Sequence, residues 1–117
     1  MLRILHLVGS CETERLYHVS LLYAKKCQHF NEFEFIYAVI RPDKKWTFTS
    51  NLNTLEDEAS SKNITMDLLE ALKHISIVVQ PDVVIHHMYC TEGSVFYRAL
   101  MESYQYHLWV HPQKLSL

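Results

Sequence analysis

The chain has 117 residues, of which 49% are hydrophobic, and a formal net charge of -2 when its histidines are neutral. This length and composition predict one domain with a sizeable core. The small negative charge argues against nucleic acid and anionic membranes as partners. The chain has three cysteines, and this small, odd number argues against a disulfide scaffold. With neither a signal peptide nor an apolar run near the ~20 residues of a membrane span, we expect a cytoplasmic protein.

The first 27 residues read as a strand, a turn and a helix. Residues 2–8 are almost continuously apolar, as in a buried parallel strand, and Gly9 and Ser10 predict the turn. The helix is expected over residues 13–27, with Glu14 in its first turn. Its expected apolar stripe consists of Leu16, Val19, Leu22 and Tyr23.

Strand and helix patterns then alternate along the rest of the chain. The expected elements are a strand over 33–40, a helix over 65–79, a strand over 83–87, a helix over 94–103 and a strand over 106–110. Asn63 or Thr65 is the expected cap of the second helix. Residues 44–53 are expected to form a loop that Trp46 and Phe48 anchor. This alternation predicts an α/β fold with a mostly parallel four-stranded sheet, in the order 2-1-3-4, and helices on both faces.

In that order, the switch point of the sheet lies between the strands over 2–8 and 83–87. Open α/β sheets bind ligands at such a point, beyond the carboxyl ends of the strands. The two loops that meet there supply Gly9, Ser10, Glu92 and Gly93 as crevice residues. Because Gly9 and Gly93 are the chain's two glycines, neither a P-loop nor a G-x-G-x-x-G fingerprint can be present.

Four residue patterns could take part in chemistry, and each has a simpler interpretation. His86 and His87 with Cys90 could suggest a zinc site, but the adjacent histidines point to opposite faces of a strand and no second ligand pair exists, so no metal site is predicted. Cys11 could pair with His87 as a nucleophile, but no orienting group or oxyanion turn accompanies it. Glu14 could serve only to complement the helix dipole. Arg98 could meet either an anion or solvent.

Several segments of the chain resemble one family, the D-alanine–D-alanine ligase-like ATP-grasp proteins, closest to the cyanobacterial branch that includes the mycosporine-type ligases. The matching segments are Leu5-His6-Leu7-Val8-Gly9-Ser10, Leu22-Tyr23-Ala24, Phe35-Ile36-Tyr37-Ala38, Pro42-Asp43 with Trp46 and Phe48, and Met88-Tyr89-Cys90-Thr91-Glu92-Gly93. Ser20 and the run Tyr97-Arg98-Ala99-Leu100 match as well. The resemblance implies that residues 1–117 form the Rossmann-like, N-terminal pre-ATP-grasp domain of such a ligase.

The resemblance also implies which residues bind substrate. Glu14 matches the family's acidic residue that contacts the amino group of the first D-alanine, although its spacing to Val19-Ser20-Leu21 is longer than the family's E-x-x-V-S-L. His87, Glu92 and Gly93 match the H-G-x-x-G-E-D-G turn, whereas Met88 and Thr91 replace two of its glycines. The substrate-binding residues expected here are Glu14 and His87, with no catalytic residue and no metal ligand.

In the family, ATP and Mg²⁺ bind to a central and a C-terminal domain, which these residues do not include. We therefore expect no cofactor in this chain itself and no ligation by this domain alone. Its expected partners are the remaining ligase domains or a second copy, together with a small amino-acid substrate. The alternative is a free-standing Rossmann-like interaction module without catalytic activity, which would bury exposed apolar residues against a partner or in a homodimer.

Overall fold

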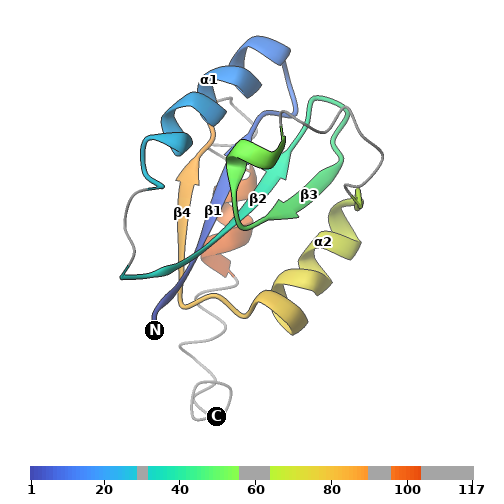
Figure 1. Ribbon diagram of the computed structural model, residues 1–117. Coiled ribbons are helices and arrows are strands. Elements are labelled where there is room, and N and C mark those ends of the chain that lie inside the picture. The colour runs from blue at the N-terminus through green and yellow to red at the C-terminus, as the bar shows by residue number, and fades with distance from the viewer. Residues whose placement is uncertain (29–31, 56–63, 90–95, 104–117) are drawn as a thin grey trace.

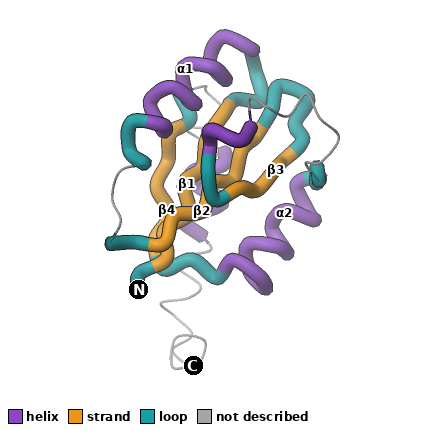
Figure 2. Tube along the Cα trace, viewed as in Figure 1, coloured by secondary structure: helices purple, strands orange, loops and turns teal. Residues whose placement is uncertain are grey.

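The computed structural model describes residues 1–28, 32–55, 64–89 and 96–103. Within these ranges a four-stranded sheet is covered by helices on both faces (Figures 1 and 2). The strands are β1 (Arg3–Gly9), β2 (Glu34–Ile40), β3 (Trp46–Thr49) and β4 (Val83–His87). Their order in the sheet is β3-β2-β1-β4.

β1 is the central parallel strand, as its apolar run predicts. It pairs in parallel with β2 on one side and with β4 on the other. Every residue from Ile4 to Gly9 is buried, because helices cover both faces of the strand. The predicted neighbours of the first strand are therefore confirmed, and so is the switch point between β1 and β4.

The fourth strand of the described sheet differs from the predicted one. The predicted strand over 106–110 lies outside the described residues, whereas β3 lies in the segment expected to be a loop and pairs antiparallel with β2. A tight turn makes this hairpin: the Lys44 N–H donates to the Arg41 carbonyl at 2.8 Å, and the Lys45 N–H donates to Asp43 Oδ1 at 2.9 Å. The sheet is therefore mixed, and the loop prediction for 44–53 is wrong where β3 pairs.

α1 (Glu14–Lys25) covers one face of the sheet. Thr13 caps it by accepting the Leu16 N–H at 3.1 Å. The predicted apolar stripe is wrong in part, because Leu22 and Tyr23 are 56% and 50% exposed. The buried residues of the helix are Ser20, Leu21 and Ala24. Two of these three side chains are small, which lets the helix backbone approach the sheet closely.

α2 (Leu68–His74) and the helical residues 96–103 cover the opposite face. Asp67 caps α2 in a capping box with Glu70, so the predicted cap at Thr65 is wrong, and Asn63 lies outside the described residues. The helix continues as a π-helical turn (Ile75–Val79), which Gln80 ends with a left-handed backbone, φ 47. No helix in the described ranges has both the length and the apolar character needed to cross a membrane.

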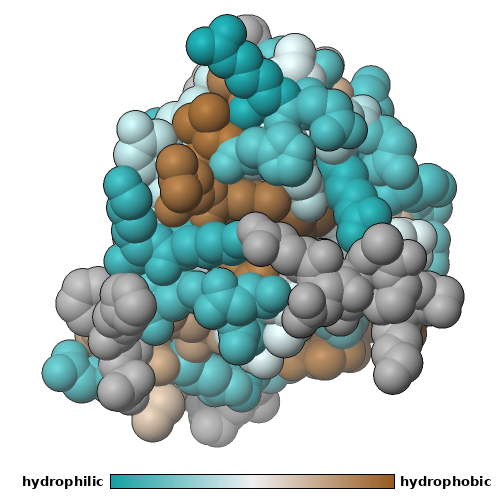
Figure 3. Space-filling view, turned by 45° about the horizontal axis from the view of Figure 1, so that its top comes forward, coloured by the Kyte–Doolittle hydropathy of each residue, from teal (hydrophilic) through white to brown (hydrophobic). Residues whose placement is uncertain are grey.

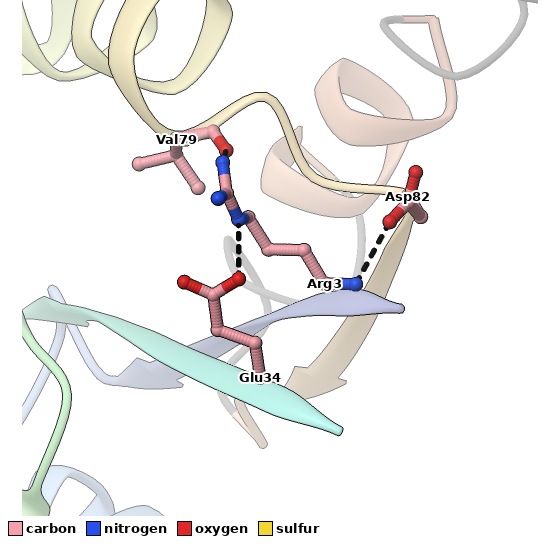
Figure 4. Close-up of polar contacts among 4 residues, drawn as sticks. All are labelled: Arg3, Glu34, Val79 and Asp82. Carbon is pink, nitrogen blue, oxygen red and sulfur yellow. Dashed lines mark hydrogen bonds and ion pairs between the residues drawn. The ribbon is translucent and has the colours of Figure 1, made fainter. Parts of the chain in front are cut away.

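At the amino edge of the sheet, Arg3 ties several elements together (Figure 4). Its Nε donates to Glu34 Oε2 on β2 at 2.9 Å, and its Nη1 donates to the Val79 carbonyl at 2.5 Å. Its backbone N–H donates to Asp82 Oδ2 at 2.8 Å, just before β4. One residue of β1 thus holds β2, the end of the π-helical turn and the residue before β4 together.

Candidate functional site

The candidate site lies at the carboxyl edge of the parallel strands, where the β1–α1 loop and the end of β4 meet. Figure 3 turns this edge toward the viewer and shows mostly hydrophilic side chains around a smaller apolar area. Of the predicted crevice residues, Gly9 and Ser10 are described, whereas Glu92 and Gly93 lie outside the described residues.

Gly9 is required by the close approach of β1 and β2. Its φ is +108, and a Cβ atom on this residue would lie 2.0 Å from the carbonyl oxygen of Ile40. Other side chains are strained at such a φ, and the clash is with backbone that cannot move aside. The close approach to Ile40 therefore explains why a glycine stands at position 9, and no bound nucleotide is needed to account for it.

The backbone N–H groups of the loop are mostly used within the protein. The Ser10 N–H donates to the Ile40 carbonyl at 3.0 Å. The buried Ser10 Oγ accepts from the N–H groups of Glu12 and Thr13, at 3.0 and 3.4 Å. A loop that cradles phosphate needs such donors to point at the ligand. This loop is therefore built for a fixed shape and not for binding a phosphate with its backbone.

Ser20 joins α1 to both strands of the switch point. Its Oγ accepts the Gly9 N–H at 2.8 Å and donates to the His87 carbonyl of β4. The side chain is fully buried, so these bonds are shielded from water. Ser20 therefore fixes the middle of α1 relative to the crevice, a role that the predicted apolar stripe did not reveal.

Glu14 is the first residue of α1, and its side chain is 80% exposed. Its Oε2 lies 3.5 Å from Nε2 of His18, one helical turn later, and this contact is an ion pair only when His18 is protonated. Thr13 and the Ser10 turn hold the backbone before it. Glu14 therefore presents a solvent-accessible carboxylate from a rigid position.

His87 is only 8% exposed, and it pairs with a residue that the sequence analysis did not single out. Its Nε2 lies 2.8 Å from Nδ1 of His6 on β1, which is 2% exposed. The two rings are stacked with centroids 5.0 Å apart. The two predicted substrate-binding residues thus differ in surroundings. The Glu14 side chain lies in solvent beside His18, whereas the His87 side chain is buried under α1 beside His6.

The histidine pair continues into an aromatic group on β2. The His6 ring stacks on Tyr37, with centroids 4.8 Å apart, and Phe35 meets its edge at 4.6 Å. Among the described residues, neither His6 Nε2 nor the Tyr37 hydroxyl has a hydrogen-bond partner. A histidine inside the apolar run of β1 was the available signal for this cluster, because a buried polar group needs a partner.

Burial sets the charge state of this cluster. It lowers the pKa of His6 to about 4, with a further lowering from His87, and it lowers the pKa of His87 as well. Burial, with a smaller contribution from Cys27, raises the pKa of Tyr37 to about 12. All three groups are therefore neutral near pH 7, and the cluster is a structural support of the site.

The remaining predicted residues are separated from this cluster. His86 points to the other face of the sheet, where burial, and next the Arg98 guanidinium, lower its pKa. Arg98 pairs with Glu102 at 3.3 Å. Cys11 is buried in the core of the α2 face, while the His87 ring packs on the α1 face, an arrangement that does not favour a nucleophile pair. In the described ranges, no three His, Cys, Asp or Glu side chains gather as a metal site would need.

No protein-family model, no curated protein and no solved structure matches this chain. The site must therefore be interpreted from its own geometry. That geometry comprises a rigid β1–α1 loop, an exposed carboxylate at the start of α1, and a buried neutral histidine pair beneath the helix.

Proposed function

We propose that this chain is the Rossmann-like, substrate-side N-terminal domain of a D-alanine–D-alanine ligase-like ATP-grasp protein, and that it acts in the cytoplasm. The observation that carries the proposal is the exposed Glu14 carboxylate, held beside the switch point of the sheet by the Ser10 and Thr13 turns. Ligands of open α/β folds bind at this edge, and a carboxylate there suits the ammonium group of a small amino acid.

The proposed chemistry divides between this domain and others. A ligase of this kind activates one carboxyl group as an acyl phosphate, and ATP and Mg²⁺ would bind to other domains of the protein. In the proposal, Glu14 contacts the ammonium group of the first amino acid. His87 belongs to the same site as the residue that positions the end of β4, because its carbonyl accepts from Ser20 and its ring pairs with His6.

The proposal can be tested by titrating the ¹⁵N-labelled chain with D-alanine and recording amide spectra. We expect weak binding, with shifts centred on the loop from Gly9 to Glu14, because only half of the amino-acid site is present. Glu14→Gln should reduce the affinity about tenfold, since it removes one charge-assisted contact. Glu32→Gln makes the same change at an exposed residue just before β2, toward the amino edge, and should leave binding unchanged.

Two outcomes would contradict the proposal. One is the absence of any loop shift at high D-alanine concentration, and the other is equal binding by the Glu14→Gln variant. A separate assay with D-alanine, ATP and Mg²⁺ should yield no ADP above background. Steady ADP production would show that these residues contain a complete active site.

A second candidate function is favoured by the exposed edge of β4. In the described residues no strand pairs with this edge, and Val83 and Ile85 on it are 37% and 38% exposed. Its sequence, Val-Val-Ile-His-His, contains no proline, lysine or carboxylate, the residues that usually protect an edge. An interaction module could therefore pair β4 with β4 of a second copy, since antiparallel pairing of the same strand satisfies twofold symmetry.

Light scattering over a range of concentrations distinguishes the two candidates. The module predicts a dimer that Val83→Lys converts to a monomer, whereas Leu69→Lys, at an exposed position on α2, has no effect. A monomer at every concentration would contradict the module, and the ligase-domain proposal would then be the remaining candidate.

A further inference from the structure

A concavity lies at the carboxyl edge of the sheet, on the α2 face. It has a volume of about 370 Å³. The β2–β3 turn, the start of α2 and the first residues of the 96–103 helix form its walls. Its lining includes Asp43, Lys44, Lys45, Asp67, Phe96 and Tyr97. Charged and aromatic side chains therefore border one space, whose volume is at the low end of the range for small-molecule sites.

Lys44 stands out in this lining because its backbone is left-handed, with φ 67. The hairpin explains this conformation: the Lys44 N–H donates to the Arg41 carbonyl at 2.8 Å and the Arg41 N–H to the Lys45 carbonyl at 3.0 Å, and such a three-residue loop ends in a left-handed residue. Glycine and asparagine adopt such a φ readily, whereas lysine is strained there. The turn places Lys44 at the carboxyl edge of the sheet, where the residue lines the pocket.

The charges around the pocket are balanced and available. Lys44 and Lys45 bring two ammonium groups, and Asp43 and Asp67 bring two carboxylates. Asp43 Oδ1 and Asp67 Oδ1 accept backbone N–H groups, so each carboxylate keeps a second oxygen for a ligand. Within the described part of the chain, these four side chains form no ion pair with one another.

The aromatic side chains of Phe96 and Tyr97 form one wall of the pocket and favour a ligand with an apolar part. Phe96 is 50% exposed at the pocket, and its ring meets the edge of the buried Tyr97 with centroids 5.2 Å apart. Tyr97 is in turn supported by the fully buried Trp46, at 5.6 Å. A ligand with a flat or bulky apolar side chain would bury this wall, while its charged ends meet the lysines and the aspartates.

We propose that this pocket binds a free zwitterionic amino acid with a large apolar side chain, through carboxylate–Lys44/Lys45 and ammonium–Asp43/Asp67 contacts. This site differs from the Glu14 site in its position, its lining and the size of its ligand. It does not depend on the proposed ligase function.

Phenylalanine is the first probe, in both enantiomers, with titrations followed by amide spectra of the full chain. We expect shifts at residues 43–45, 67–68 and 96–97. 3-Phenylpropionate lacks the ammonium group and 2-phenylethylamine lacks the carboxylate, so each should bind about tenfold more weakly than phenylalanine. Inorganic phosphate should not compete. Equal binding by phenylpropionate, or competition by phosphate, would make this an anion site and overturn the proposal, as would the absence of binding.

Lys44→Gly gives the sharpest test, because the strain and the ligand contact predict opposite effects. The variant should melt at a higher temperature than the parent chain and bind phenylalanine about tenfold more weakly. Lys73→Gln, at an exposed residue on α2, should change neither property. A Lys44→Gly variant that is more stable but binds equally well would contradict the assignment.

Asp67→Asn tests the other charged end without removing the helix cap, since asparagine caps helices as well as aspartate does. It should weaken phenylalanine binding while leaving the melting temperature nearly unchanged. Unchanged affinity in this variant would remove the ammonium contact from the proposal. Glu14→Gln should not affect phenylalanine binding, so failure here and failure of the Glu14 site are distinguishable.

Discussion

At position 9, backbone geometry determines which residue type can be accommodated. Two independent constraints apply to it, namely a φ of +108 and an approach of 2.0 Å between an added Cβ atom and the Ile40 carbonyl oxygen. Sequence reasoning identified the turn at this position and excluded a phosphate loop from the shortage of glycine. It could not supply the packing reason, because Ile40 lies on a different strand.

We predict that Gly9→Ala lowers the free energy of unfolding by about 2–4 kcal/mol, from backbone strain and the clash with β2. Urea denaturation measures the change. Gly9→Asn should be no better tolerated, although asparagine accepts positive φ more readily, since it also carries a Cβ atom. Full stability in Gly9→Asn would mean that φ alone, and not the approach to Ile40, constrains this position.

At the scale of elements, the attachment of α1 to the sheet depends on small and polar side chains. Ser20 accepts from Gly9 and donates to the His87 carbonyl, while Leu21 and Ala24 pack on the core of the same face. The hydrophobic pattern favoured a stripe that includes Leu22 and Tyr23, both half exposed in the structure. Hydrophobicity alone misplaces the buried face of this helix because a buried serine contributes hydrogen bonds and close packing instead.

Ser20→Ala should lower the free energy of unfolding by about 1–3 kcal/mol, because it leaves the buried Gly9 N–H and His87 carbonyl without this partner. Thermal or urea denaturation measures the loss. Ser76→Ala, at an exposed position in the π-helical turn, is the matched control and should stay within about 0.5 kcal/mol of the parent. Equal stability of the two variants would show that α1 is held by apolar packing alone.

For the whole molecule, the buried histidine pair links folding to pH. The His6 pKa falls from 6.5 to about 4 in the folded protein, first through burial and second through His87. Between these two values the unfolded chain binds more protons than the folded one, so stability rises with pH. The stabilisation is complete above about pH 6.5 and is lost as pH falls toward about 4.

We therefore predict that acidification from pH 7 to pH 4 costs the parent chain about 3 kcal/mol through His6, on the basis of about 1.4 kcal/mol for each pKa unit. Urea denaturation across this range measures the slope. A double variant, His6→Leu with His87→Leu, should show a flatter dependence, in which the contribution of His86 remains. His18→Gln, which changes an exposed histidine, should keep the parent slope. An unchanged slope in the double variant would contradict the assignment.

Sequence reasoning described local features of this protein well. The apolar run of β1, the start of α1 and the parallel neighbours of the central strand follow from hydrophobic period and turn residues, which act over a few positions. The β2–β3 hairpin was missed although Trp46, Thr47, Phe48 and Thr49 alternate as a strand does. The segments on both sides of this short strand are polar and favoured a loop, and an alternation over four residues was too short to indicate a strand against them.

Local sequence features predicted an α/β chain with a central buried strand, a glycine at the end of that strand and a carboxylate at the start of the next helix. Two features could be seen in the folded chain alone: His6 and His87, 81 residues apart, share a hydrogen bond, and Lys44, Asp67 and Phe96 line one pocket. Hydrophobic periodicity indicates which face of each helix or strand is buried in the core. Which polar groups pair, and which turns enclose a space, depends on how distant segments pack together.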